Sequence, residues 1–289
     1  MRKLLVLAGA IAAMALLPAS QALGASHNPT GEYAQFNECP LNDEAVFGCI
    51  YSESSGGYFE MGAKTVPLVN PVVLQGGLEF DESHKEHFVG AENGETLVKV
   101  AQPVPGGLLG IEAPKWWPIW LQSWFNNAIN EGFTGVQATV ELAGPASGIS
   151  INLINLVFEK GTAISLPVKI KLSNAILGSN CYIGSDSSPV VIDFTSGETS
   201  PPPPNEPIHG SAGTAEKNEA GTIFTLSGGA LLNNSFAAPG ANGCGGLFSF
   251  FIDPLVNSIV GLPSPAGTNT AVLEGTLQQA VASAVKASE

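Results

Sequence analysis

Tryptophan is concentrated in one short segment of this chain. All four tryptophans lie within the segment 115–133, at Trp116, Trp117, Trp120 and Trp124. Aromatic rings of this size offer broad apolar faces, as in stacking on sugar rings, and tryptophan is favoured where a protein meets a partner or a membrane. These four residues are therefore the first candidates for a binding site, with a glycan or a partner surface as the ligand.

The spacing within this segment predicts an amphipathic helix. Pro118 suits a first helical turn and Gly132 a C-terminal stop. The simplest interpretation places the rings in the core; a carbohydrate platform and a membrane or partner surface are the two alternatives. The polar face contains no lysine or arginine, which weakens the prediction of a simple membrane contact. From Trp117 onward, the apolar residues that define one helical face fall at positions 117, 120, 121, 124, 125, 128 and 129.

Sulfur chemistry in this chain points to crosslinks. The four cysteines of the segment that follows the N-terminal leader are Cys39, Cys49, Cys181 and Cys244. An even number in an exported chain predicts two disulfides, and we favour the pairs Cys39–Cys49 and Cys181–Cys244. The absence of any CxxC pair argues against a zinc site. Oxidised cysteines supply no thiolate, so a cysteine nucleophile is not expected.

Acidic residues and histidines offer weaker candidates. The run EFDESHKEH at 79–87 places His84 and His87 among carboxylates, but its spacing matches no zinc-protease motif. A solvated loop is the simpler interpretation, with a weakly held divalent cation as the alternative. We assign no metal and no cofactor.

No established catalytic motif is present. The chain lacks a G-x-S-x-G elbow, a P-loop and a G-x-G-x-x-G run after a strand. A glycosidase needs only two carboxylates, and Glu141, Glu159 and Asp193 are the acids nearest to strand-like segments. Each is more simply interpreted as a surface charge, so no catalytic residue is assigned.

The first 24 residues predict a secretory signal peptide. Arg2 and Lys3 precede an uncharged apolar run, which Pro18 ends before small residues at two cleavage positions. The run is too short to span a bilayer, so no transmembrane segment is expected after cleavage. Removing residues 1–24 takes away two cations and changes the net charge from −14 to −16. An acidic chain repels nucleic acid and anionic lipid, so we expect neither as a partner.

The elements that must position these residues are mostly strands. In the central stretch 166–194, apolar and polar residues alternate from Val168 to Ser173, and two further short strands follow around Cys181 and Val190. Turn-forming runs such as 54–57 and 76–77 recur every eight to twelve residues. The pattern predicts a mainly β chain, an antiparallel β-sandwich or barrel-like domain spanning 25–289, with the tryptophan-rich helical insert.

Four segments leave finer questions. The apolar run 247–262 predicts a second, short and buried helix, kinked or restarted at Pro254. The segment 149–158 fits either a strand or a short helix. The tail predicts a strand at 270–276 followed by helical spacing from Leu277. The segment 196–219 contains four consecutive prolines and few apolar residues, so we expect an exposed loop.

Two runs resemble a group of exported proteins from soil actinobacteria to which no activity is assigned. They are ASHNPTGEYAQFNECP at 25–40 and LSNAILGSNCYIGSDSSPVVIDFTSGETSPPPPNEPI at 172–208. The resemblance implies export and a shared β-rich fold, and it carries over no catalytic residue. We therefore expect a secreted or cell-envelope protein without enzymatic activity that binds an envelope component or a glycan. The alternative is a carbohydrate-active hydrolase that uses a carboxylate pair.

Overall fold

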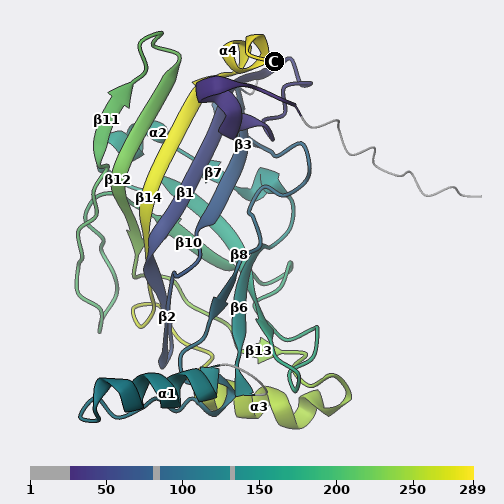
Figure 1. The fold of residues 1–289 in the computed structure, drawn as a ribbon, viewed down its shortest axis with the longest axis vertical. Helices are drawn as coiled ribbons and strands as arrows, with labels where there is room; N and C mark the ends of the chain where they lie inside the picture. The colour runs from purple at the N-terminus through teal and green to yellow at the C-terminus, as the bar shows by residue number, and fades with distance from the viewer. Residues whose placement is uncertain (1–26, 81–84, 131–133) are drawn as a thin grey trace, which may run out of the picture.

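The chain folds as two antiparallel β-sheets packed face to face (Figure 1). The computed structural model describes residues 27–80, 85–130 and 134–289. It confirms the prediction of a mainly β, sandwich-like fold with few short helices. The predicted signal peptide, together with His84 of the acidic run, lies outside the described residues.

The first sheet is built on two long central strands, β1 and β14, which pair over most of their length. Its order is β11-β12-β14-β1-β3-β4, and β2 also pairs with β1. The strands are β1 (Val46–Met61), β2 (Lys64–Pro67), β3 (Val72–Phe80), β4 (Glu86–Gly90), β11 (Thr214–Lys217), β12 (Ile223–Asn233) and β14 (Thr270–Val281).

The second sheet is organised around β8, where the sequence pattern is strongest. Buried and half-buried residues alternate along all ten residues of this strand, as period-2 patterning requires. The order is β13-β9-β8-β6-β5, with β10 and β7 also paired to β8. The strands are β5 (Ala101–Pro103), β6 (Gln137–Leu142), β7 (Ser150–Ile151), β8 (Ile164–Ser173), β9 (Tyr182–Ile183), β10 (Val190–Phe194) and β13 (Ala241–Asn242).

Two turns predicted from glycine are wrong, because both segments continue as strands. The run 54–57 forms a β-bulge within β1, and 76–77 lies in the middle of β3. Gly57 has φ of +106°, and a Cβ atom there would lie 2.1 Å from the carbonyl oxygen of Val272. Glycine is needed here for close approach of two strands rather than for a reversal of the chain.

The helices gather at the two ends of the sandwich. Figure 1 shows α1 and α3 together at one end, across the long axis, while α4 and the C-terminus lie at the other. No helix of the described residues has the length and apolarity to cross a membrane. The α-helices are α1 (Ile119–Asn130), α2 (Leu153–Val157), α3 (Ser249–Val260) and α4 (Ala282–Ala287); the 3-10 helices are η1 (Gly31–Phe36), η2 (Gly107–Leu109), η4 (Ala146–Gly148) and η5 (Gly246–Phe248).

The two segments whose sequence fits either a strand or a helix, 149–158 and the tail from 270, each contain both. The segment 149–158 contains the short strand β7 and then α2. In the tail, β14 extends to Val281, so the helical spacing that begins at Leu277 is misleading for its first residues. Only α4 follows it. Pairing with two long neighbours, β1 and β12, extends the strand beyond what the local sequence indicates.

The proline-rich segment is exposed at its prolines but is anchored at both sides. Pro202, Pro203 and Pro204 are exposed, whereas Ser196 is fully buried and donates a hydrogen bond to the carbonyl oxygen of Leu156 at 2.7 Å. Its last residues form the edge strand β11 rather than a loop. Backbone pairing with β12 supplies the order that the composition of the segment does not predict.

Candidate binding surface at the aromatic end

The four candidate tryptophans do not lie in the core. Trp116, Trp120 and Trp124 are 83%, 71% and 65% exposed. Trp117 is half-buried and packs edge-on against Phe125, with ring centroids 5.6 Å apart. The interpretation of α1 as a helix with its rings in the core is therefore wrong, and no residue of this helix is fully buried.

The orientation of α1 follows from hydrogen bonds to the preceding loop. The side-chain oxygen of Asn126 accepts a hydrogen bond from the backbone N–H of Ala113 at 2.8 Å. The side-chain oxygen of Asn130 likewise accepts from the backbone N–H of Gly106 at 2.9 Å. Backbone groups left without partners are costly, so these amides turn toward the loop. Part of the predicted polar outer face, Gln122, Asn126 and Asn130, is therefore half-buried on the inner side, whereas Ser123 and Asn127 are exposed.

The α3 helix has the same arrangement. The Asp253 carboxylate accepts hydrogen bonds from the backbone N–H groups of Gly243 and Cys244, at 3.2 and 2.7 Å. The Asn257 side chain both accepts from and donates to the backbone of Ala241. The polar side chains of this helix thus hold the loop that precedes it, and its aromatic side chains point outward.

The prediction of a buried helix at 247–262 is consequently wrong in two respects. Phe250 and Phe251 are 65% and 67% exposed, and their rings lie 4.1 Å apart between centroids. The helix is also continuous through Pro254, so it does not restart there. Proline removes only its own N–H from the helical hydrogen bonds, and side-chain contacts on the inner side hold the helix on both sides of that position.

Together the two helices and their flanks form one exposed apolar surface, which we call the aromatic end. Large aromatic side chains carry about 150–250 Å² each, so nine mostly exposed apolar residues present on the order of 1,000 Å². Monomeric proteins rarely expose a patch larger than a few hundred Å² without a function. The residues are Trp116, Ile119, Trp120, Trp124, Leu247, Phe248, Phe250, Phe251 and Leu255.

The three candidate acids do not form a catalytic pair. Glu141 lies opposite Lys169 on β8, and Asp193 lies opposite Ser165 on the other side of the same strand. The offset of four residues along β8 and the two strand spacings across it separate the acids by roughly 15 Å, beyond the range of glycosidase carboxylates. A Glu159 carboxylate oxygen accepts from the backbone N–H of Ala212 at 2.9 Å.

The exposed face near Glu141 carries an ion pair. The Lys169 ammonium lies 2.6 Å from an Asp186 carboxylate oxygen, and this contact lowers the pKa of Asp186 and raises the pKa of Lys169. The same ammonium lies 5.7 Å from the ring centroid of Tyr182. An exposed pair of this kind contributes little to stability, and it supplies no acid or base with a pKa near neutrality.

The structure confirms both predicted disulfides, Cys39–Cys49 and Cys181–Cys244, and it contains no free cysteine among the described residues. Cys244 lies in the loop held by Asp253, so the second crosslink fixes the support of α3 to the second sheet. Of the described part of the acidic run 79–87, His87 is exposed on β4. The described residues contain no cluster of three or more metal-ligating side chains.

Comparisons with protein-family models, with curated proteins and with solved structures gave no match to this chain.

Proposed function

We propose that this protein is an exported, non-enzymatic component of the cell envelope that attaches through its aromatic end to a neutral or zwitterionic lipid surface. One observation carries the proposal: in both helices the polar side chains that bond to neighbouring loops turn inward, whereas the large aromatic side chains of Trp120, Trp124, Phe250 and Phe251 are exposed. Two helices lying together across one end of the molecule suit a flat surface (Figure 1).

The composition of the aromatic end favours lipid over a glycan. Sugar recognition needs hydrogen-bonding side chains beside the stacking rings. Asn126, Asp253 and Asn257 are already bonded to neighbouring backbone, which leaves the short Ser123 and Asn127 side chains exposed on α1. Asp253 is the only charged residue in either helix, and the chain has a formal net charge of −14. Lys115, exposed beside Trp116, adds one cation at this end, but the net charge of the chain remains strongly negative. An acidic protein is repelled by anionic lipids, so the proposal specifies uncharged head groups.

Two further features support export. The N-terminal segment has the pattern of a signal peptide, and two buried disulfides are typical of oxidising compartments. Neither feature assigns a catalytic role, and the separation of Glu141 from Asp193 disfavours the hydrolase alternative.

The distribution of tryptophan provides a direct test. Every tryptophan lies in or beside α1, so intrinsic fluorescence reports only on the aromatic end. Titration with phosphatidylcholine vesicles is expected to shift the emission to the blue, and vesicles with brominated acyl chains are expected to quench it. Vesicles of phosphatidylglycerol are expected to give a smaller shift, because they repel the acidic chain.

Substitutions in α3 test attachment while all four tryptophans remain in place to report on binding and folding. The double substitution Phe250→Ser and Phe251→Ser is expected to weaken vesicle binding at least tenfold, because burial of each ring contributes about 2 kcal/mol. Phe158→Ser is the matched control, because this ring is 66% exposed beside α2 and away from the aromatic end. Unchanged binding in the double variant contradicts the proposal.

Two other results also overturn the lipid assignment. One is a dimer in sedimentation that the same double substitution converts to a monomer, which makes a second copy the partner. The other is retention on insoluble cell-wall glycan that is lost in Trp120→Ala and Trp124→Ala, without any binding to vesicles.

A further inference from the structure

A row of three apolar cavities extends from α3 into the space between the sheets. The first, between α3 and η2, has a volume of about 70 Å³; the second, beside the hairpin of β1 and β2, also has about 70 Å³. A third, deeper between the sheets, has about 40 Å³. Val104, Leu172 and Val260 line both the first and the second, and Phe59 and Val140 line both the second and the third. Because they share these lining residues, the second cavity adjoins both the first and the third.

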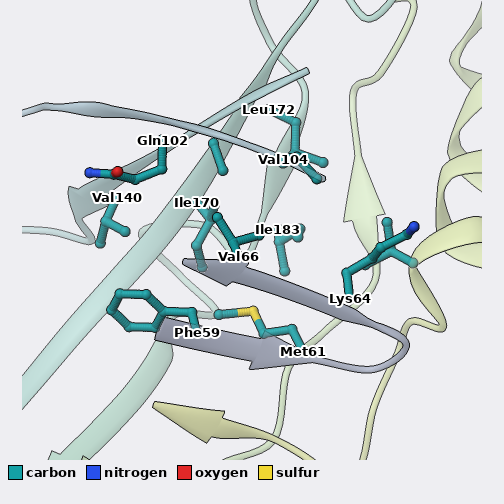
Figure 2. Close-up of a pocket in the computed structure, with 12 residues that line it drawn as sticks. Phe59, Met61, Lys64, Val66, Gln102, Val104, Val140, Ile170, Leu172 and Ile183 are labelled. Atoms are coloured by element: carbon teal, nitrogen blue, oxygen red, sulfur yellow. The ribbon is translucent and has the colours of Figure 1, made fainter. Parts of the chain in front are cut away.

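The lining of the middle cavity favours an aliphatic occupant over water. Figure 2 shows Phe59, Met61 and Val66 facing Ile170 and Ile183 of the second sheet across this space. Buried water needs two to four polar partners, and this lining offers almost none.

Gln102 is the only uncharged polar side chain in that lining, and its amide makes three of its four possible hydrogen bonds with the protein. Its oxygen accepts from the backbone N–H groups of Val69 and Asn70, at 3.0 Å each, and its nitrogen donates to the carbonyl oxygen of Asn70. The loop after β2 thus occupies both acceptor sites and one of the two N–H donors of this amide, so Gln102 offers the cavity at most one hydrogen bond.

Lys64 supplies the one positive charge of this row. The residue is half-buried and lines both the first and the second cavity, and its ammonium donates to the carbonyl oxygen of Gly110 at 3.2 Å. Within the described residues no carboxylate forms an ion pair with it. An ammonium in such surroundings normally has a counter-charge. In Figure 2 its side chain lies at the rim, turned away from the apolar residues.

The first cavity lies directly under the exposed helix α3. Leu255 of α3 lines it and is 52% exposed at the aromatic end. The Lys64 ammonium lies beside Gly110, where a Cβ atom would also touch Ile259 in the wall of this cavity. The row thus begins under the exposed helix beside this ammonium and ends between the sheets.

We propose that this row binds one medium-length aliphatic chain with an anionic head group paired to Lys64. Together the three cavities are slightly larger than the ~150 Å³ apolar cavity that holds a six-carbon ring, so an acid of about six to eight carbons matches their size. This inference stands on the cavities and on Lys64, and it is independent of attachment at the aromatic end.

Calorimetric titration with monomeric sodium octanoate tests the proposal without any vesicle. From hexanoate to octanoate, affinity is expected to rise about fourfold per methylene, with a plateau at longer chains once the row is full. The failure of vesicle attachment leaves this result unaffected. Octanoate and mono-octanoyl glycerophosphate share the required chemistry, and the tighter ligand identifies whether the natural source is a free acid or a lipid.

Two pairs of variants separate the chain from the head group. Lys64→Met is expected to weaken octanoate at least tenfold while octanol changes less than twofold; Lys99→Met, at an exposed lysine on none of these cavity walls, is the control. Val140→Phe is expected to abolish both ligands by filling the row, whereas Val191→Phe, at a residue 45% exposed, changes neither. Val66→Phe replaces Val140→Phe if that variant fails to fold.

Three results overturn the inference. The first is the absence of octanoate binding to the wild-type protein, and the second is an affinity that does not depend on chain length. The third is a Lys64→Met variant that binds octanoate as tightly as the wild type.

Discussion

The two ends of the sandwich differ in whether their apolar side chains are buried or exposed. At the end with α4, small residues are buried: Val285 is fully buried, and it packs in a separate cluster with Phe36 and the Cys39–Cys49 disulfide. At the aromatic end, the largest side chains of α1 and α3 are exposed. The difference shows that size and hydropathy do not decide burial here.

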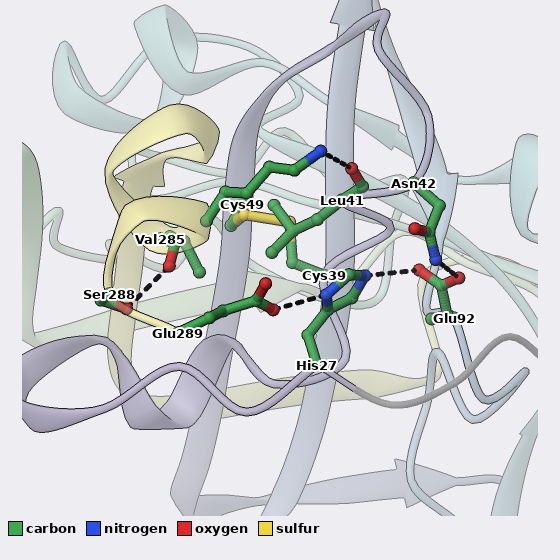
Figure 3. A network of polar contacts seen from close by, with 10 residues as sticks. His27, Cys39, Leu41, Asn42, Cys49, Glu92, Val285, Ser288 and Glu289 are labelled. Carbon is green, nitrogen blue, oxygen red and sulfur yellow. Dashed lines mark hydrogen bonds and ion pairs between the residues drawn. A yellow bond between two sulfur atoms is a disulfide. The ribbon is translucent and has the colours of Figure 1, made fainter.

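Polar contacts close the α4 end, which we call the closed end. Figure 3 shows the His27 ring between two carboxylates, with Nδ1 2.5 Å from an oxygen of Glu289 and Nε2 3.6 Å from an oxygen of Glu92. Lys286 donates to the carbonyl oxygen of Leu41 at 3.4 Å. These contacts join segments from both ends of the described chain over a small core. At the aromatic end, polar contacts instead hold the inner side of each helix and leave its large aromatic side chains exposed.

The crosslinks offer the largest test of this comparison, because one disulfide supports each end. Replacing Cys181 and Cys244 by serine is expected to lower the free energy of unfolding by about 4 kcal/mol, and replacing Cys39 and Cys49 by about 3 kcal/mol. The sequence separations are 63 and 10 residues, and a longer closed loop restricts the unfolded chain more. Urea unfolding measures both; a larger loss at the closed end contradicts the loop-entropy explanation.

Truncation of one side chain at each end sharpens the comparison. Val285→Ala is expected to cost about 2 kcal/mol, because it removes two buried methyl groups and leaves a cavity. Trp124→Ala removes a far larger side chain but is expected to change stability by less than about 0.5 kcal/mol, since most of the ring is in solvent. Thermal unfolding of both variants checks the prediction. A larger loss in Trp124→Ala means that the ring belongs to the core.

A smaller effect is expected from the amides under α1. Asn126→Ala leaves the backbone N–H of Ala113 without its partner and is expected to cost about 1–2 kcal/mol. Asn127→Ala is the matched control, because this exposed neighbour changes helix propensity equally. The difference between the two variants in urea unfolding isolates the loop contact. Equal stabilities show that packing, not this hydrogen bond, sets the orientation of α1.

Prediction from sequence succeeded where the local residue pattern, or the number of cysteines, was enough to indicate the structure. The alternation along β8 and the pairing of Cys181 with Cys244 were both correct. It failed at glycines, because Gly57 and Gly76 lie within strands and permit close contact with a neighbouring strand. A glycine permits a turn and a close approach alike, and only the partner strand distinguishes them.

The sequence composition identified the tryptophan-rich helix as a candidate site, but it did not predict which side of the helix faces outward. Clustering of Trp116, Trp117, Trp120 and Trp124 is visible in the sequence, whereas the contribution of Phe250 and Phe251 required the structure. The run 247–262 carried the same signal, since it is apolar with one acid, but its aromatic residues are as typical of a buried helix. The cavities beside Lys64 have no sequence signal, because their walls come from strands far apart in the chain.

The sequence by itself determined that this chain forms crosslinked antiparallel sheets, because two-residue periodicity and an even cysteine number are local or countable properties. Tertiary structure alone decided which side of α1 and α3 faces outward. Helical periodicity marks an apolar face but carries no information about direction. The unpaired N–H groups of two nearby loops supplied that direction, since they needed the amide and carboxylate oxygens that only the polar side of each helix offers.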